Sequence, residues 1–506
     1  MVSSNAPVIE TLSPSFLSLP TELKQHILSL LPDLASVERA ILVHPSLYQS
    51  FIGAESVIIT HILKRQIGSK LITLVEDVAD AATINPWSRE RMSSLLCRIF
   101  IRNKHYKSYL GAQYQRAYKL SVLEKQQRKW TLRHALHAAE LHRDVEYFSR
   151  DFADCTLGTI RTPLSDNEKH RIKRSFYIFE LYCTAFRRRK YRELADPEQA
   201  SRFSIESQRH FFLRNFPSWQ LEQIACVYEY LKTHITPAFD DVAQHDVEWG
   251  HQFIDWMDEN NTHKEFVVSQ GLAYLRKLGA ETSYDDRYQL LLNVTSSPSE
   301  SRYVLHDQSF FHAAMSPHAP QNYSLIEYLD KMEDGVQVES QTLLVASHLE
   351  NYLLADPDVG PFYAWLWAHR SLPNVMVYFD PDQKRIRSRG YVMWDRARLS
   401  RRWGKLSNPW RRPRLNVNDE IERLKQKVEM RVGFQERSWI FRSGGRGWWS
   451  EADKTKVVWP EMYQTQAEKN CKELTGLPLG SVSETKRTER IEVEPVPPDP
   501  APRQEP

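Results

Sequence analysis

The stretch SDNEKHRIKRSFYIFELYCTAF, residues 165–186, decides the fold class. Its first four residues read as a capping box, in which the side chains of Ser165 and Glu168 satisfy backbone N–H groups at the start of a helix. Five apolar residues then recur at intervals of four, three, four and three, which is the repeat of one helical face: Ile172, Phe176, Phe179, Cys183 and Phe186. The spacing predicts a buried stripe, with arginine and lysine on the outside of the helix.

Similar stripes on both sides of this stretch extend the helical pattern over most of the chain. One follows Pro217-Ser218 and another occupies residues 71–82; their members are Leu221, Ile224, Tyr228, Leu231 and Ile235, and Leu71, Leu74, Val75, Val78 and Ala82. Only 17 of the 506 residues are glycine, which argues against turn-rich β folds and glycine-rich phosphate loops. We therefore predict a mainly α protein with a trihelical N-terminal unit (16–60), a helical body (61–370) and a smaller mixed region with short strands (371–460).

The composition also bounds the compartment and the partners. Residues 1–15 and the proline-rich, acidic tail 477–506 lack the apolar content of a folded segment, so we expect both to be disordered. The five cysteines lie far apart without a C-x-x-C pair, which indicates neither a disulfide framework nor a zinc finger. The N-terminus lacks the pattern of a signal peptide, and no apolar run is long enough for a membrane span. We expect a cytoplasmic or nuclear protein with no membrane partner and no cofactor.

Residues 17–51 hold more apolar side chains than three short helices need for a core. Leu19-Pro20 precedes the first helix, because proline suits the first turn of a helix. We expect Ser36 to cap a second helix and Pro45 to begin a third. A unit of this size needs a partner for stability, and the pattern leaves two alternatives open: packing on the body behind it, or docking of another protein. The apolar face expected on the first helix consists of Leu23, Ile27, Leu30 and Leu31.

The same residues resemble the F-box motif. The likeness consists of Leu19-Pro20-x-Glu22-Leu23-x-x-x-Ile27-Leu28-x-x-Leu31 and its continuation in Leu34, Val37, Ala40 and Val43. In place of the usual ending the chain has Val43-His44-Pro45-Ser46-Leu47-Tyr48, with the large aromatic residue moved to Tyr48 or Phe51. This variant looks like the divergent F-boxes of some filamentous-fungal proteins. Three further segments, residues 176–183, 217–231 and 390–399, are similar to the same fungal F-box-like group.

The resemblance implies a substrate receptor of an SCF-type cullin–RING ubiquitin ligase. Such a receptor brings a target protein close to a ubiquitin-loaded enzyme and performs no bond chemistry itself. Its partners would be a Skp-type adaptor and, through the adaptor, a cullin, together with a substrate protein held by the rest of the chain. The resemblance assigns the adaptor contact to Leu19, Pro20, Glu22, Leu23, Ile27, Leu28, Leu31 and Leu34.

A basic, aromatic segment occupies residues 384–414. It holds twelve arginine and lysine residues against one acid, Asp395, which is a local charge of +11 in a chain whose total is +3. The rest of the chain is therefore acidic enough to pair with it internally, and its arginines can also stack on the interleaved aromatic residues. The alternative is a surface that neutralises phosphates and stacks bases, which makes nucleic acid a second, less favoured partner. The candidate residues of that basic surface are Arg396, Arg398, Arg401 and Arg402.

No catalytic constellation stands out, and we expect a protein that is not an enzyme. The histidines within residues 134–142 do not share one helical face, and no H-E-x-x-H pattern is present. His245 and His251 would point about 120° apart around a helix, so we do not expect them to share a metal ion. The glycines of residues 443–449 match no phosphate-binding motif and predict a tight turn that presents two tryptophans.

Overall fold

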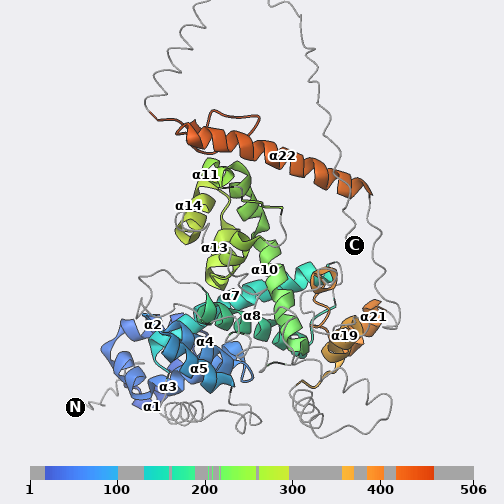
Figure 1. Ribbon diagram of the computed structural model, residues 1–506. Coiled ribbons are helices and arrows are strands. Elements are labelled where there is room, and N and C mark those ends of the chain that lie inside the picture. Colours follow the sequence, from blue (N-terminus) through green and yellow to red (C-terminus); the bar gives the residue numbers. More distant parts are fainter. Residues whose placement is uncertain are drawn as a thin grey trace, which may run out of the picture.

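The computed structural model of the chain describes residues 18–100, 130–158, 162–187, 203, 208, 216, 218–252, 254–257, 261–295, 356–369, 384–403 and 417–460. Helices make up most of these residues, and the described strands form a single antiparallel pair, β1 (Arg446–Gly447) and β2 (Val457–Val458) (Figure 1). The prediction of a mainly α protein is confirmed. The two segments predicted to be disordered, 1–15 and 477–506, lie outside the described residues.

The helices share one main hydrophobic core. It extends from Leu28 near the N-terminus to Leu399, so the N-terminal helices are continuous with the body. A second, small cluster lies beneath the last helix. The helices are α1 (Thr21–Leu30), α2 (Leu34–Val43), α3 (Pro45–Ile67), α4 (Ile72–Ala82), α5 (Arg89–Phe100), α7 (Leu132–Leu157), α8 (Asp166–Phe186), α10 (Ser218–His245), α11 (Val247–His251), α12 (Thr262–Val268), α13 (Leu272–Ala280), α14 (Tyr284–Thr295), α19 (Gly360–His369), α20 (Lys384–Arg387), α21 (Arg396–Trp403) and α22 (Val417–Arg442).

The helix α8 is central to the body and begins at the predicted capping box. Ser165 Oγ accepts the N–H of Glu168 at 3.1 Å, and the Glu168 carboxylate accepts the N–H of Ser165 at 3.0 Å. All five residues of the predicted stripe are buried. The prediction of a charged outer face holds only in part, because α4, α7 and α10 all pack against α8. Arg171 is therefore 1% exposed and donates hydrogen bonds to Asp356 and Asp395.

The other two predicted stripes lie in α10 and α4. All five apolar residues of the α10 stripe are buried, and α10 packs against α8 along this face. In the α4 stripe Leu71, Val75 and Val78 are buried, whereas Leu74 is half-buried and Ala82 is exposed at the end of the helix. The helical periodicity of the sequence therefore identified the buried stripes of α8 and α10 in full and that of α4 in part.

The N-terminal helices α1, α2 and α3 are present, with two changes to their predicted limits. The third begins at Pro45 as predicted, but it continues to Ile67, beyond the expected boundary of the unit at residue 60. The second begins at Leu34, so Ser36 is not its cap. Asp33 is the N-cap and accepts the N–H of Ser36 at 2.7 Å, since its extended backbone leaves the carboxylate free to reach over the first turn.

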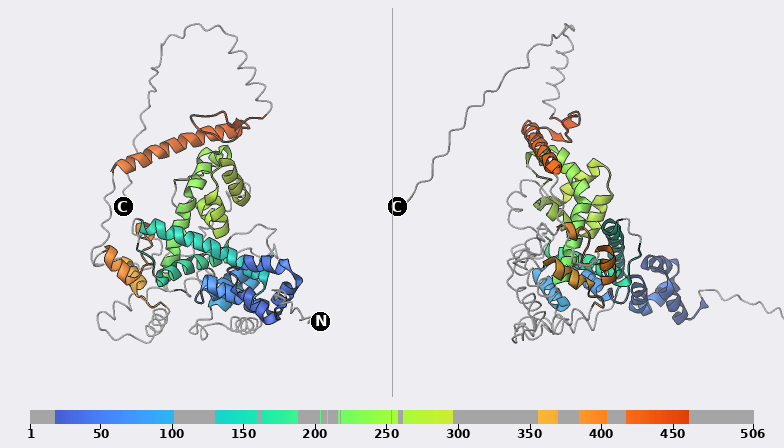
Figure 2. Two further views of the ribbon diagram at one scale, coloured as in Figure 1. Left: turned by 180° about the vertical axis from the view of Figure 1, so that it is seen from behind. Right: turned by 90° about the vertical axis from the view of Figure 1, so that its right-hand side faces the viewer.

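Residues 384–403 return to the body and lie beside α10 and α19 (Figure 2). Tyr391 to Trp394 have no exposed surface, which makes this short stretch part of the core although it carries few regular hydrogen bonds. Gln223 Nε2 donates to the carbonyl of Val392 at 2.9 Å, and Trp394 Nε1 donates to the carbonyl of Arg389 at 2.9 Å. These contacts satisfy polar groups that a buried loop would otherwise leave unpaired.

The predicted mixed region contains a long helix that the sequence pattern did not reveal, α22. This helix lies across the end of the molecule opposite to α1 and packs on α11 (Figure 1). Gly250 permits the close approach, because an added Cβ would lie 2.5 Å from the side chain of Arg437. The chain then turns at Gly444, whose φ of +89° suits glycine, into β1. The tight turn predicted for residues 443–449 is present, but it does not present two tryptophans: Trp449 is buried in the small cluster beneath α22, and Trp448 is half-buried.

Candidate functional site

The outward face of α1 combines residues that the motif assigns to an adaptor with Leu30, which the motif does not include. Leu23 is 48% exposed and Leu30 is 60% exposed, with half-buried Ile27 between them. Spacings of four and three residues place these side chains on one face of the helix. This face is bordered by Pro20 and Glu22, which are exposed, and by Leu19 and Leu31, which are half-buried.

Two of the residues that the motif assigns to the adaptor lie in the core and not at the surface. Leu28 is 1% exposed and Leu34 is fully buried. Five residues separate Leu28 from Leu23, which corresponds to about 140° around a helix, and this turns Leu28 toward α3. These two side chains support α1 and α2 from beneath and have no surface to offer a partner.

Polar contacts with α3 fix the orientation of α1. Lys24 Nζ donates to Ser46 Oγ at 2.6 Å near the start of both helices. At the other end the Arg65 guanidinium donates to the carbonyls of Ser29 and Leu31, which have no partner inside the helix. The helix is therefore held at both ends with its apolar face directed outward.

Further exposed apolar side chains lie around the junction of α2 and α3. Leu42 is 78% exposed and Val43 is 77% exposed, at the end of α2. Tyr48 and Ile52, in the first turns of α3, are 46% and 49% exposed, whereas Phe51 is buried. Of the two aromatic residues considered for the altered motif ending, Tyr48 is thus the one at the surface. Exposed apolar residues in such number are typical of an interaction site.

The basic segment is largely used inside the protein. Arg398 donates two hydrogen bonds to Glu168, at 2.7 and 2.8 Å. Arg387 pairs with Glu222 at 2.8 Å, and both side chains are almost completely buried. Burial opposes the ionisation of Glu168, but the hydrogen bonds from Arg398 and two backbone N–H groups outweigh it, so the pKa of Glu168 lies below its ordinary value.

Of the other candidate residues of the basic surface, Arg396 stacks on an aromatic ring and Arg401 is exposed. The Arg396 guanidinium lies 5.4 Å from the ring centroid of Tyr363, within the range of a cation–π contact. Arg401 is exposed, and the side chain of Arg402 lies outside the described part of the chain. The +11 charge of residues 384–414 is therefore not all available at the surface, because Arg387 and Arg398 are neutralised by the carboxylates of Glu222 and Glu168.

His245 and His251 face different parts of the C-terminal region, as their spacing predicts. His245 Nδ1 lies 2.9 Å from the carbonyl of Trp449, and His251 Nδ1 lies 3.1 Å from Ser438 Oγ. Each ring therefore fastens α22 and the following turn to α10 and α11. Among the described residues no group of three His, Cys, Asp or Glu side chains is arranged to hold a metal ion.

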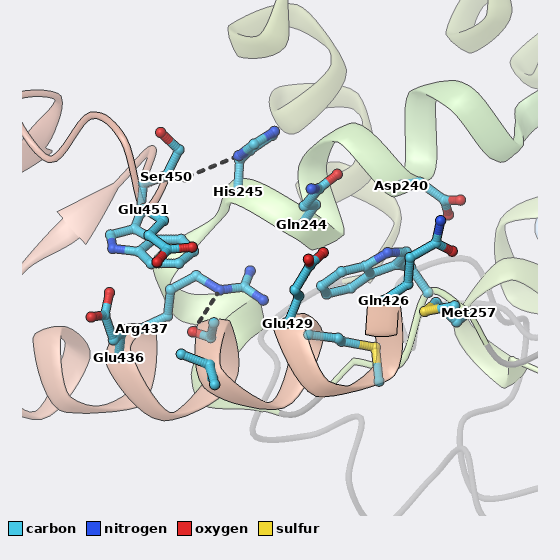
Figure 3. A pocket seen from close by; sticks show the side chains of 15 residues that line it. Asp240, Gln244, His245, Met257, Gln426, Glu429, Glu436, Arg437, Ser450 and Glu451 are labelled. Atoms are coloured by element: carbon cyan, nitrogen blue, oxygen red, sulfur yellow. Dashed lines mark hydrogen bonds between the residues drawn. The ribbon is translucent and has the colours of Figure 1, made fainter. Parts of the chain in front are cut away.

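A cavity of about 820 Å³ lies between α22 and the end of α10 (Figure 3). No pattern in the sequence indicated this cavity, because its two walls are separated by more than 150 residues and α22 itself was not predicted. Its charged lining residues are Asp240, Glu429, Glu436, Arg437 and Glu451. Carboxylates thus outnumber cations in its lining, and the cavity suits a ligand that is positively charged.

No helix in the described ranges combines the length and the apolar character needed to cross a bilayer. Comparisons of the chain with protein-family models, with curated proteins and with solved structures gave no match.

Proposed function

We propose that this chain is an F-box-like substrate receptor of an SCF-type cullin–RING ubiquitin ligase. The observation that carries the proposal is the outward apolar face of α1. Leu23 and Ile27, which belong to the motif that resembles an F-box, meet solvent there beside Leu30, which lies between motif positions. A helix that only packed on the body would turn these residues inward. The partner at this face is a Skp-type adaptor and, through it, a cullin.

The arrangement suits action by proximity. The helices α1 and α22 lie at opposite ends of the molecule, so an adaptor bound at α1 leaves the α22 end open to a target protein (Figure 1). The main core extends from Leu28 in α1 to Trp249 in α11, and α22 packs on α11 over a second, separate cluster. Holding a target near a ubiquitin-loaded enzyme raises its effective concentration without any catalytic group on the receptor.

The test is binding of a purified Skp-type adaptor to the full chain, measured by calorimetry. We expect the wild-type chain to bind and the variant Leu23→Asp/Ile27→Asp to bind at least about a hundredfold more weakly, since each apolar side chain buried in an interface contributes about 1.5–3 kcal/mol. Both positions are partly exposed in the free protein, so aspartate should be tolerated by the fold.

The control is Val458→Asp, which makes the same kind of apolar-to-carboxylate change at the far end of the molecule. Val458 is 64% exposed. It should leave adaptor binding unchanged. Absence of binding by the wild-type chain, or equal binding by the α1 variant and the control, would contradict the proposal.

A further inference from the structure

The cavity between α22 and α10 has an acidic rim that is only partly neutralised by the protein itself. Lys264 pairs with Asp240 at 2.6 Å, and Lys454 pairs with Glu436 at 3.3 Å. Within the described part of the chain Glu429 and Glu451 form no ion pair, and both are exposed at the mouth of the cavity. A bound cation would therefore meet carboxylates that are still available for pairing.

The wall of the same cavity contains hydrogen-bond donors without acceptors. Arg437 is fully buried, with Nη1 donating to the carbonyls of Ala243 and Asp246, whereas its Nη2 has no acceptor among the described residues. Trp449 Nε1 is likewise buried without an acceptor in that part of the chain. A buried donor left unpaired is energetically unfavourable, because it has lost water without gaining an acceptor. Figure 3 shows the Arg437 guanidinium extending from α22 into the space between Glu429 and His245.

An apolar stripe on α22 continues from this cavity. Its members recur at spacings of three, four, four and seven residues, which is one face of a helix, and each is between 46% and 65% exposed. Val432 belongs both to the stripe and to the lining of the cavity, so the two features are continuous. The stripe consists of Ile421, Leu424, Val428, Val432 and Trp439.

We infer that the cavity and the adjoining stripe of α22 form a docking site for a basic, amphipathic peptide segment of a target protein. Lysine or arginine side chains pair with Glu429 and Glu451, a peptide carbonyl provides an acceptor for the donors of the wall, and the apolar side of the segment covers Val428 and Val432. Charge complementarity selects this occupant over an acidic or neutral one. The inference names the substrate class of the proposed receptor and so rests on the proposed function for its biological role.

Fluorescence anisotropy of the full chain without any adaptor tests the inference. The probe is a fluorescein-labelled amphipathic peptide in which leucines alternate with pairs of lysines, and its counterpart has glutamate in place of lysine. We expect saturable binding of the lysine peptide and none of the glutamate peptide. Combined replacement of the three rim carboxylates should weaken binding about tenfold, since each exposed ion pair contributes only modestly. These replacements are Glu429→Gln, Glu436→Gln and Glu451→Gln.

A matched control removes the same charge from exposed positions elsewhere: Glu38→Gln, Glu90→Gln and Asp285→Asn. It should retain wild-type affinity, and equal weakening by the two triple variants would mean that the peptide senses only net charge, which overturns the inference. Val432→Lys provides a second test, because it puts a cation at the edge of the cavity from a position that is 47% exposed. This variant should fold normally and should also lose about tenfold in affinity.

Two further outcomes decide between occupants and between proposals. If the wild-type chain binds no peptide, but a chain with Arg411, Arg412 and Arg414 all changed to glutamine does bind, the occupant is this chain's own basic segment and an external target is excluded. The rim variants should still bind the Skp-type adaptor, and the Leu23→Asp/Ile27→Asp variant should still bind the peptide. Adaptor binding without peptide binding would thus overturn this inference alone.

Discussion

Replacing Glu168 by alanine should release residues 384–403 from the body. The side chain is 1% exposed, and its two oxygens accept four hydrogen bonds. The N–H groups of Ser165 and Asp395 donate at 3.0 Å each, and Arg398 donates through Nε at 2.7 Å and through Nη2 at 2.8 Å. Alanine removes the carboxylate half of the capping box of α8, whereas Ser165 Oγ can still accept the N–H of residue 168. It also removes the link to a segment that is more than 200 residues away in sequence.

The expected loss is about 3–5 kcal/mol. The cap alone contributes about 1 kcal/mol. Removing one partner of a buried ion pair costs about 3–5 kcal/mol, because the other charge stays uncompensated. The Arg398 side chain is 12% exposed and regains some solvation, so the lower part of this range applies to the pair. At about 1.4 kcal/mol for each factor of ten, amide hydrogens of residues 384–403 should exchange about two to three orders of magnitude faster.

Hydrogen exchange of the full chain, read by mass spectrometry of its peptides, measures this opening directly. The control is Asp166→Ala, in the same first turn of α8. Asp166 is 98% exposed, and within the described ranges its one ion pair is with Lys169 at the surface. Its exchange in residues 384–403 should match that of the wild type. If the Glu168 and Asp166 variants exchanged alike in this segment, the buried ion pair would not be what holds it.

The same carboxylate predicts a pH dependence. The pKa of Glu168 is lowered in the folded chain, so its contribution to stability is present above the ordinary value near 4.5. This contribution is lost as the pH falls through the lowered value. Protection of residues 384–403 in the wild type should therefore decrease in acid, while the alanine variant shows no such change from this group.

Three other perturbations test the interior. Burial raises the pKa of Glu180 to about 7, so ionisation of this carboxyl lowers the stability of the folded chain as the pH rises. Glutamine at this position can still accept the N–H of Leu272. In thermal unfolding Glu180→Gln should therefore stabilise the chain by about 3 kcal/mol at pH 8 and by much less near pH 4.5. Glu222→Leu should cost about 3–5 kcal/mol in urea unfolding, and adding Arg387→Met should recover most of it. Arg401→Gln should not change retention of the chain on single-stranded RNA at low salt, in contrast to a nucleic-acid surface at this segment.

Local rules of the sequence succeeded where both partners lie within a few residues of one another. The capping box of Ser165 and Glu168 needs only one helical turn, and the α8 and α10 stripes need only the helical period. The same rules misplaced the cap of α2, because Asp33 and Ser36 are both good caps and the choice depends on where Leu34 enters the core.

Long-range pairing could not be read from the sequence. The excess of positive charge in residues 384–414 indicated that acidic partners exist, but not that Arg398 meets Glu168 or that Arg387 meets Glu222. The helix α22 was missed for a different reason. The proline, glycine, tryptophan and arginine of residues 371–460 favoured short strands, although Ile421, Leu424 and Val428 recur at the helical period. The buried side of α22 mixes apolar residues such as Phe434 with Arg437, so no continuous apolar stripe marks that side.

The buried ion pairs of residues 384–403 do not involve the helix that carries the proposed adaptor face. Arg398 and Arg387 join residues 384–403 to α8 and α10, whereas the hydrogen bonds of Lys24 and Arg65 hold α1 against α3. Loosening the segment should therefore leave the outward face of α1 unchanged. The Glu168→Ala variant should bind a Skp-type adaptor as the wild type does, because mutations at distant sites without shared partners act independently. Loss of adaptor binding in this variant would mean that the orientation of α1 depends on the whole body, and that the α1 face cannot be treated as a site of its own.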